Sequence, residues 1–137
     1  IIFAHIGDSR IGLVHEGAYL QLTSDHSLVN ELVKAGQLTP EEAANHPQRN
    51  IITQSIGQAG PIEPDLGIQT LDAGDYLIVN SDGLTNMISN DIIVATLETA
   101  DLSLDDKAKR LVELANEAGG LDNITVALVH AESEETE

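Results

Sequence analysis

The chain has 137 residues, which is the usual size of one folded domain. Its 23 acidic and 6 basic residues give a formal net charge of −17, which should repel nucleic acid and anionic membranes and attract divalent cations. Solubility alone is an equally good reason for such an acidic surface. Cysteine is absent, which excludes disulfides, thiolate zinc sites and cysteine nucleophiles, and no apolar run reaches the ~20 residues that span a membrane. This composition is compatible with a cytoplasmic protein.

Apolar runs separated by turn residues predict strands at the start of the chain. Residues 1–6 have the composition of a buried strand. Residues 11–15 and 18–23 predict a hairpin that turns at Glu16 and Gly17.

Two short helices are expected next. Residues 28–35 form an apolar-periodic segment that should end at Gly36. A second helix should begin after Thr39, because Thr39 is a good N-cap, Pro40 suits the first helical position and Glu42 can close a capping box.

The second half of the chain begins with residues 57–67, where glycine and proline predict a loop. The elements expected after it are strands at 68–71 and 76–80 joined by a turn at 72–75, a helix capped by Asn90 that runs to residue 97, a helix after the N-cap Ser103, and a strand at 124–130. Strands and helices come in runs rather than in strict alternation, which favours an α+β layered fold over a doubly wound sheet.

Three aspartates lie in short turns beside apolar, strand-like runs. Asp8 follows the first run, Asp82 follows residues 76–80, and Asp122 precedes the last run. Each is an ordinary turn residue when judged singly, and the pair Asp82-Gly83 is typical of a tight turn. Together they suggest one oxygen-rich site for a hard divalent cation such as Mg²⁺ or Mn²⁺.

Five longer blocks of sequence contain or surround these aspartates. They resemble, in order and spacing, the C-terminal part of the metal-dependent protein phosphatases of type 2C, the PPM family, and in particular the small bacterial serine/threonine phosphatases. The blocks are GDSR (7–10), LTSDHSLVNELVKAG (22–36), HPQRNIITQSIG (46–57), GDYLIVNSDGLTNMI (74–88) and GGLDNITVALV (119–129).

The resemblance implies an α+β fold, the four-layer α-β-β-α sandwich of type 2C phosphatases. Residues 1–130 would be the C-terminal part of a single phosphatase domain, with a flap at about 29–50 that lies over the active site. Residues 131–137 would be an acidic, disordered tail, because the segment AESEETE is strongly charged.

The same resemblance implies ligand roles. Asp82 and Asp122 match the aspartates that bind the dinuclear Mn²⁺ or Mg²⁺ centre, and Asp8 matches a ligand of a third, weaker metal. The implied reaction is attack of metal-activated water on phosphoserine or phosphothreonine. The implied partners are phosphorylated proteins and a cognate serine/threonine kinase, with no nucleic acid and no membrane.

Three parts of the family's site have no match in this chain. The bridging aspartate, the phosphate-binding arginine and the histidine proposed as general acid are expected upstream of Ile1, so no catalytic residue is assigned here. The chain resembles a piece of a longer phosphatase that would be nearly inactive alone. Two alternatives stay open: a non-catalytic regulatory or binding module that keeps half of the fold, and a site completed by a second polypeptide.

Some polar residues near these blocks invite a functional role but have a simpler explanation. His26 is expected to make structural hydrogen bonds, and Arg10 to be a structural donor near the GDSR turn. Arg49 is a further candidate for phosphate contact. His5 stands where many family members have asparagine, and we interpret it as a tolerated variant.

Overall fold

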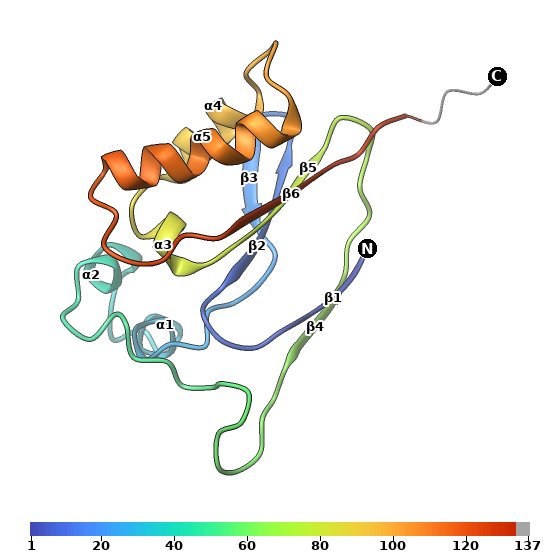
Figure 1. Ribbon diagram of the computed structural model, residues 1–137. Coiled ribbons are helices and arrows are strands. Elements are labelled where there is room, and N and C mark those ends of the chain that lie inside the picture. Colours follow the sequence, from blue (N-terminus) through green and yellow to red (C-terminus); the bar gives the residue numbers. More distant parts are fainter. Residues whose placement is uncertain (134–137) are drawn as a thin grey trace.

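The computed structural model describes residues 1–133, in which the strands form two antiparallel sheets (Figure 1). Helices α4 and α5 cover one face of the larger sheet. The larger sheet has the order β3-β2-β5-β6, and the smaller pairs β1 with β4. The strands are β1 (Ile2–His5), β2 (Arg10–His15), β3 (Ala18–Gln21), β4 (Asp65–Ile68), β5 (Tyr76–Asn80) and β6 (Val126–His130).

The helices of the described residues are short except for the last. Those in the middle of the chain are α1 (Leu28–Lys34) and α2 (Pro40–Ala44), followed by α3 (Asp82–Thr85), α4 (Asn90–Leu97) and α5 (Leu104–Glu117). Local capping signals explain where most of them begin. Ser103 caps α5, and both hydrogen bonds of the predicted capping box between Thr39 and Glu42 are present in α2.

The hairpin predicted between residues 11 and 23 is confirmed. Strands β2 and β3 pair antiparallel, and Glu16 and Gly17 between them have φ angles of 46° and 76°. Two consecutive left-handed residues match the right-handed twist of the strands, which is why this short turn suits them.

The core lies between the four-stranded sheet and helices α4 and α5. Its fully buried side chains are Ile78, Leu84, Ile93, Leu97 and Leu111. Lys107 is also buried, and its Nζ donates to the Leu97 carbonyl oxygen at 2.6 Å and to the Tyr76 hydroxyl at 2.8 Å. The ammonium group therefore joins α5 to the carboxyl end of α4, where a positive charge is favourable.

The prediction for residues 57–71 was wrong in part. The strand is β4, Asp65–Ile68, rather than 68–71, and it pairs with β1 instead of forming a hairpin with β5. The misleading residue is Gly67, since a Cβ there would lie 2.2 Å from the ring of Phe3. This glycine is a strand residue covered by a cross-strand aromatic ring, not a loop residue.

Two smaller predictions also need correction. Ser89, rather than Asn90, is the N-cap of α4, because its hydroxyl accepts from the Ile92 amide. Asp82 and Gly83 do not form a hairpin turn, as they open helix α3.

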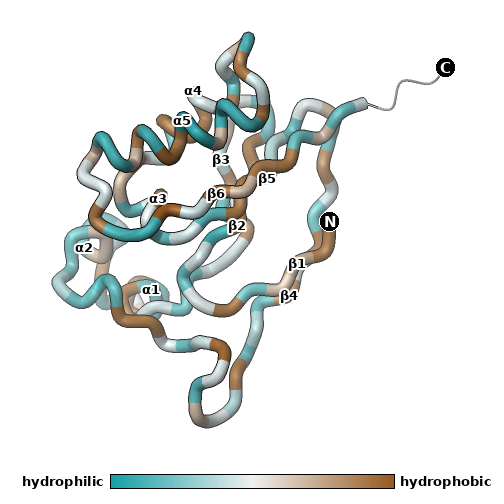
Figure 2. Tube along the Cα trace, in the orientation of Figure 1, coloured by the Kyte–Doolittle hydropathy of each residue, from teal (hydrophilic) through white to brown (hydrophobic). Residues whose placement is uncertain are grey.

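One face of the β1–β4 sheet is apolar and exposed. Ile2, Leu66 and Ile68 are 85%, 76% and 81% exposed, and Figure 2 shows brown segments along these strands. A patch of this kind is typical of a surface that packs against further protein. Residues 134–137 of the predicted tail lie outside the described residues, and the domain boundary at residue 130 stays a prediction.

Candidate metal and phosphate site

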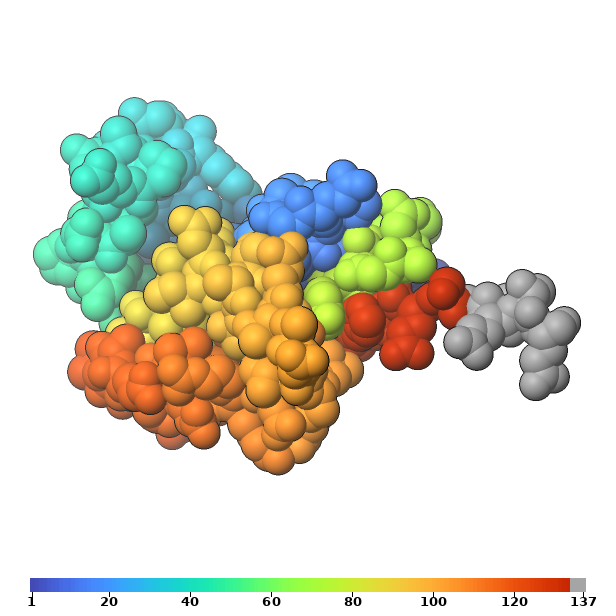
Figure 3. Space-filling model, turned by 90° about the horizontal axis from the view of Figure 1, so that it is seen from above, coloured from blue at the N-terminus to red at the C-terminus, as the bar shows by residue number. Residues whose placement is uncertain are grey.

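A hollow with a volume of about 510 Å³ lies between residues 28–50 and helix α3. Figure 3 shows the lobe built by α1 and α2 beside the residues around α3. Acidic side chains and residues of the neighbouring helices line the hollow. Its lining residues include Asp8, Asp25, Asp82, Val29, Ala43 and Arg49.

Sheet register places the three predicted aspartates at one end of the larger sheet. Arg10 of β2 pairs with Asn80 of β5, and Asn80 pairs in turn with Val126 of β6. Asp8 precedes Arg10 by two residues, and Asp82 follows Asn80 by two. Antiparallel pairing therefore brings these strand ends together although they are far apart in the sequence.

Asp8 and Asp82 line the same cavity, and their carboxyl groups interact. Burial raises the pKa of Asp8 above its ordinary value, and the nearby charge of Asp82 raises it further. Two carboxylates that repel each other in a hollow are a suitable oxygen donor set for a hard divalent cation, which would relieve the repulsion. The residues present therefore fit the implied metal.

Asp122 is the predicted ligand that the cavity does not include. It is exposed, and its Oδ1 accepts from the Asn123 amide at 2.7 Å. Its loop is nevertheless fixed against α3, because the Ser81 hydroxyl donates to the Asn123 carbonyl oxygen at 3.2 Å and accepts from the Thr125 amide at 3.0 Å. The structure thus brings together Asp8 and Asp82 and leaves Asp122 on an adjacent loop.

Gly83 allows this loop to lie so close to α3. A Cβ at residue 83 would lie 2.1 Å from the carbonyl oxygen of Asn123, which no side chain tolerates. Glycine is therefore required after Asp82 by close backbone approach, and not by the turn geometry that the sequence suggested.

Arg10 forms a bidentate ion pair with Asp25 at the cavity wall. Its Nε donates to Asp25 Oδ1 at 3.0 Å and its Nη2 to Asp25 Oδ2 at 2.7 Å. The prediction that Arg10 is a structural donor is confirmed, and its partner Asp25 was missed by the sequence analysis. Arg49 reaches the same cavity from the chain segment after α2.

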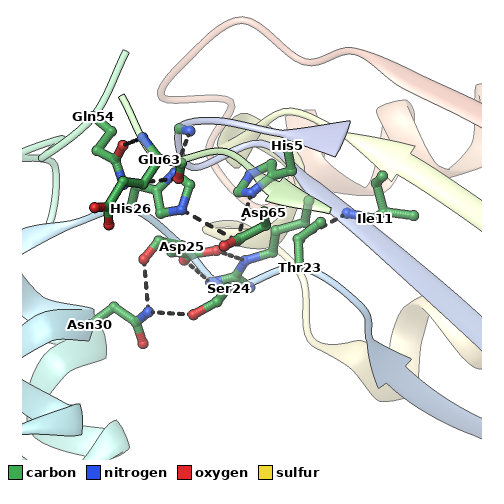
Figure 4. Close-up of polar contacts among 12 residues, drawn as sticks. His5, Ile11, Thr23, Ser24, Asp25, His26, Asn30, Gln54, Glu63 and Asp65 are labelled. Atoms are coloured by element: carbon green, nitrogen blue, oxygen red, sulfur yellow. Dashed lines mark hydrogen bonds and ion pairs between the residues drawn. The ribbon is translucent and has the colours of Figure 1, made fainter. Parts of the chain in front are cut away.

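Behind the cavity, two histidines share one carboxylate (Figure 4). His5 Nδ1 and His26 Nε2 each lie 3.3 Å from Asp65 Oδ2, and both rings are buried. Burial opposes ionisation of Asp65, but the hydrogen bonds from the two histidines lower its pKa below the ordinary value. The structural role expected for His26 is confirmed. Asp65 could not be found from sequence, because its strand was misplaced.

The segment that borders the cavity is tied at its base. The Thr53 amide donates to the His26 carbonyl oxygen at 2.9 Å, and the Leu28 amide donates to the Ile51 carbonyl oxygen at 3.0 Å. Ser27 then caps α1 through its hydroxyl. The two ends of residues 28–50 are therefore held side by side, close to the turn that carries Asp8.

Comparison with known proteins identifies this architecture. No protein-family model matches the chain. A Streptococcus pyogenes protein that bears the name of a 2C-type protein phosphatase is 72% identical over 136 residues, which are 99% of this chain and 55% of that protein. The S. agalactiae serine/threonine phosphatase superposes with a TM-score of 0.92 at 70% identity, covering 96% of this chain and 54% of that structure.

A second solved structure contains metal. The catalytic domain of the serine/threonine protein phosphatase PstP, described in complex with two manganese ions, matches with a TM-score of 0.80 at 34% identity, over 96% of this chain and 54% of that one. The fold is therefore that of the bacterial type 2C phosphatases. The chain is similar to these phosphatases over almost its whole length and spans about half the length of the relatives it matches. Among residues 1–133, no helix has both the length and the apolar composition for crossing a membrane.

Proposed function

We propose that the chain is the C-terminal part of a bacterial metal-dependent serine/threonine protein phosphatase. The observation that carries this proposal is the pair Asp8 and Asp82 in one cavity, within a chain 72% identical to part of a 2C-type phosphatase. The exposed apolar face of the β1–β4 sheet supports a larger domain in which further protein covers it.

In this proposal Asp8, Asp82 and Asp122 hold Mn²⁺ or Mg²⁺, with Asp8 serving a third and weaker ion. Divalent cations, when bound, supply a more acidic water and neutralise the charge of the phosphoryl oxygens. The chain's own residues hold and orient this centre, while Arg49 is the cavity-lining cation available to a phosphate group.

The substrates would be proteins carrying phosphoserine or phosphothreonine. A water oxygen would form the new bond to phosphorus as the bond to the serine or threonine oxygen breaks. The cytoplasm as the compartment and a serine/threonine kinase as the opposing enzyme belong to the same proposal and depend on the resemblance alone.

A chimera tests the proposal directly. This chain would replace the matching 136 residues of the Streptococcus pyogenes relative, and hydrolysis of para-nitrophenyl phosphate and of a phosphothreonine peptide would be measured with and without Mn²⁺. We expect turnover only with metal, a loss of at least 100-fold in Asp82→Asn, and almost none in the isolated 137-residue chain. A folded chimera that binds Mn²⁺ without hydrolysing either substrate would favour the non-catalytic alternative.

A further inference from the structure

We propose that His26 is a positioning residue for Asp8, acting through Gly7 and held in its working tautomer by Asp65. The proposal rests on the proposed role of Asp8 as a metal ligand. It begins from a reciprocal pair of hydrogen bonds. The Gly7 amide donates to His26 Nδ1 at 3.0 Å, and the His26 amide donates to the Gly7 carbonyl oxygen at 2.8 Å.

These two bonds fix the direction in which Asp8 leaves the chain. The Gly7 amide belongs to the peptide plane before Gly7, and its carbonyl belongs to the plane that leads into Asp8. Gly7 itself has a φ of 108°, a conformation that side chains rarely adopt and that glycine leaves by low-cost rotation. His26 therefore constrains both peptide planes around the most pliable residue next to Asp8.

Only one neutral tautomer of His26 can do this. A backbone amide always donates, so Nδ1 must carry a lone pair and the ring proton must be on Nε2. Asp65 Oδ2 lies 3.3 Å from Nε2, and its negative charge favours the ring proton on that nitrogen. The carboxylate thus selects the tautomer that leaves Nδ1 free for Gly7, and the same proton prevents Nε2 from being a metal ligand in this arrangement.

His5 provides a matched control within the same cluster. Its ring is also buried, lies 5.1 Å from the His26 ring and shares Asp65 Oδ2 (Figure 4). It makes no hydrogen bond to Gly7 in the described residues. A change at His5 disturbs the buried cluster to a similar degree without removing the acceptor for the Gly7 amide.

Two substitutions at His26 separate the two ring nitrogens. In His26→Asn, the amide oxygen can take the place of Nδ1 and accept from Gly7. In His26→Gln, the amide reaches toward Asp65, and the Gly7 amide loses its acceptor. A general packing role of His26 would make these two variants alike, whereas the positioning role makes them differ.

The first measurement is hydrogen exchange of the Gly7 amide by NMR in the 137-residue chain, with the Ile78 amide as a core reference. We expect exchange at Gly7 at least 10-fold faster in His26→Gln, and little changed in His26→Asn and His5→Asn. Unchanged exchange in His26→Gln, or equal acceleration in all three variants, would overturn the proposal. This readout does not depend on whether the protein is a phosphatase.

The second measurement is Mn²⁺ binding to the chimera by titration calorimetry without substrate. Loss of a group that orients a metal ligand weakens metal binding by about 10-fold or more. We expect that loss in His26→Gln and near-normal affinity in His26→Asn and His5→Asn. Equal affinities in all variants, in a chimera that binds Mn²⁺ normally, would refute the coupling to Asp8 while leaving the proposed function intact.

Discussion

Substituting Gly83 with alanine should test how the site is assembled, because this residue lies where α3 meets the loop of Asp122. The added Cβ would lie 2.1 Å from the Asn123 carbonyl oxygen, while ordinary van der Waals contact begins at 3.4 Å. The two backbone segments must therefore separate by more than 1 Å. That movement strains or breaks the hydrogen bonds between Ser81 and the loop.

The expected cost combines overpacking with the weakened hydrogen bonds. Overpacking typically costs about 1–3 kcal/mol, and a lost hydrogen bond adds about 1 kcal/mol. Gly83→Ala should thus lower the free energy of unfolding by about 2–4 kcal/mol, which is a fall in Tm of roughly 10 °C for a chain of this size. Because Asp82 and Asp122 flank the clash, Mn²⁺ affinity of the chimera should fall as well.

Urea unfolding followed by circular dichroism measures the loss, and Ser81→Ala is the control. That variant removes the hydroxyl bonds without a clash and should cost only about 1–2 kcal/mol. If Gly83→Ala unfolds within 0.5 kcal/mol of the parent chain, the backbones are not as close as described and the reasoning fails.

Two further predictions concern ionisable pairs at opposite ends of the larger sheet. Asp8→Asn removes the charge that Asp82 repels, so the metal-free chimera should gain stability in thermal melts while the stabilisation by added Mn²⁺ shrinks; a loss of metal-free stability would contradict this. His15 Nδ1 lies 2.7 Å from Asp75 Oδ1, and this hydrogen bond raises the pKa of His15. The Asp72 amide and then His15 hold the pKa of Asp75 below its ordinary value. The pair therefore stabilises most from about pH 4 to about pH 6.5, and its contribution fades as pH rises through the raised pKa of His15. His15→Gln should lower the Tm most near pH 5.5 and little at pH 9, and a pH-independent difference would refute the assignment.

Local signals were sufficient to predict α1 and α2 beside the cavity, although they did not predict α3. Thr39, Pro40 and Glu42 all act within one turn of helix. Their contacts are between near neighbours in the sequence, and α2 begins where they predict. Residues that pair over long distances gave no such signal. Asp65 became a strand residue through β1, some 60 positions earlier, and only that pairing places it between His5 and His26.

The aspartates show the same division between local and distant information. The sequence places Asp8 and Asp82 beside strand ends, but each strand has two ends and several possible neighbours. The register Arg10 with Asn80 decides which ends meet, and it decides this through side chains that pack in the core rather than through the aspartates. Asp122 lies in the same row through Val126 of β6, yet three loop residues separate it from that strand, and it is not among the residues that line the cavity. A candidate metal site built in this way depends on how loops are held, which is why substitution of Gly83 or His26, neither of them a ligand, should disturb it.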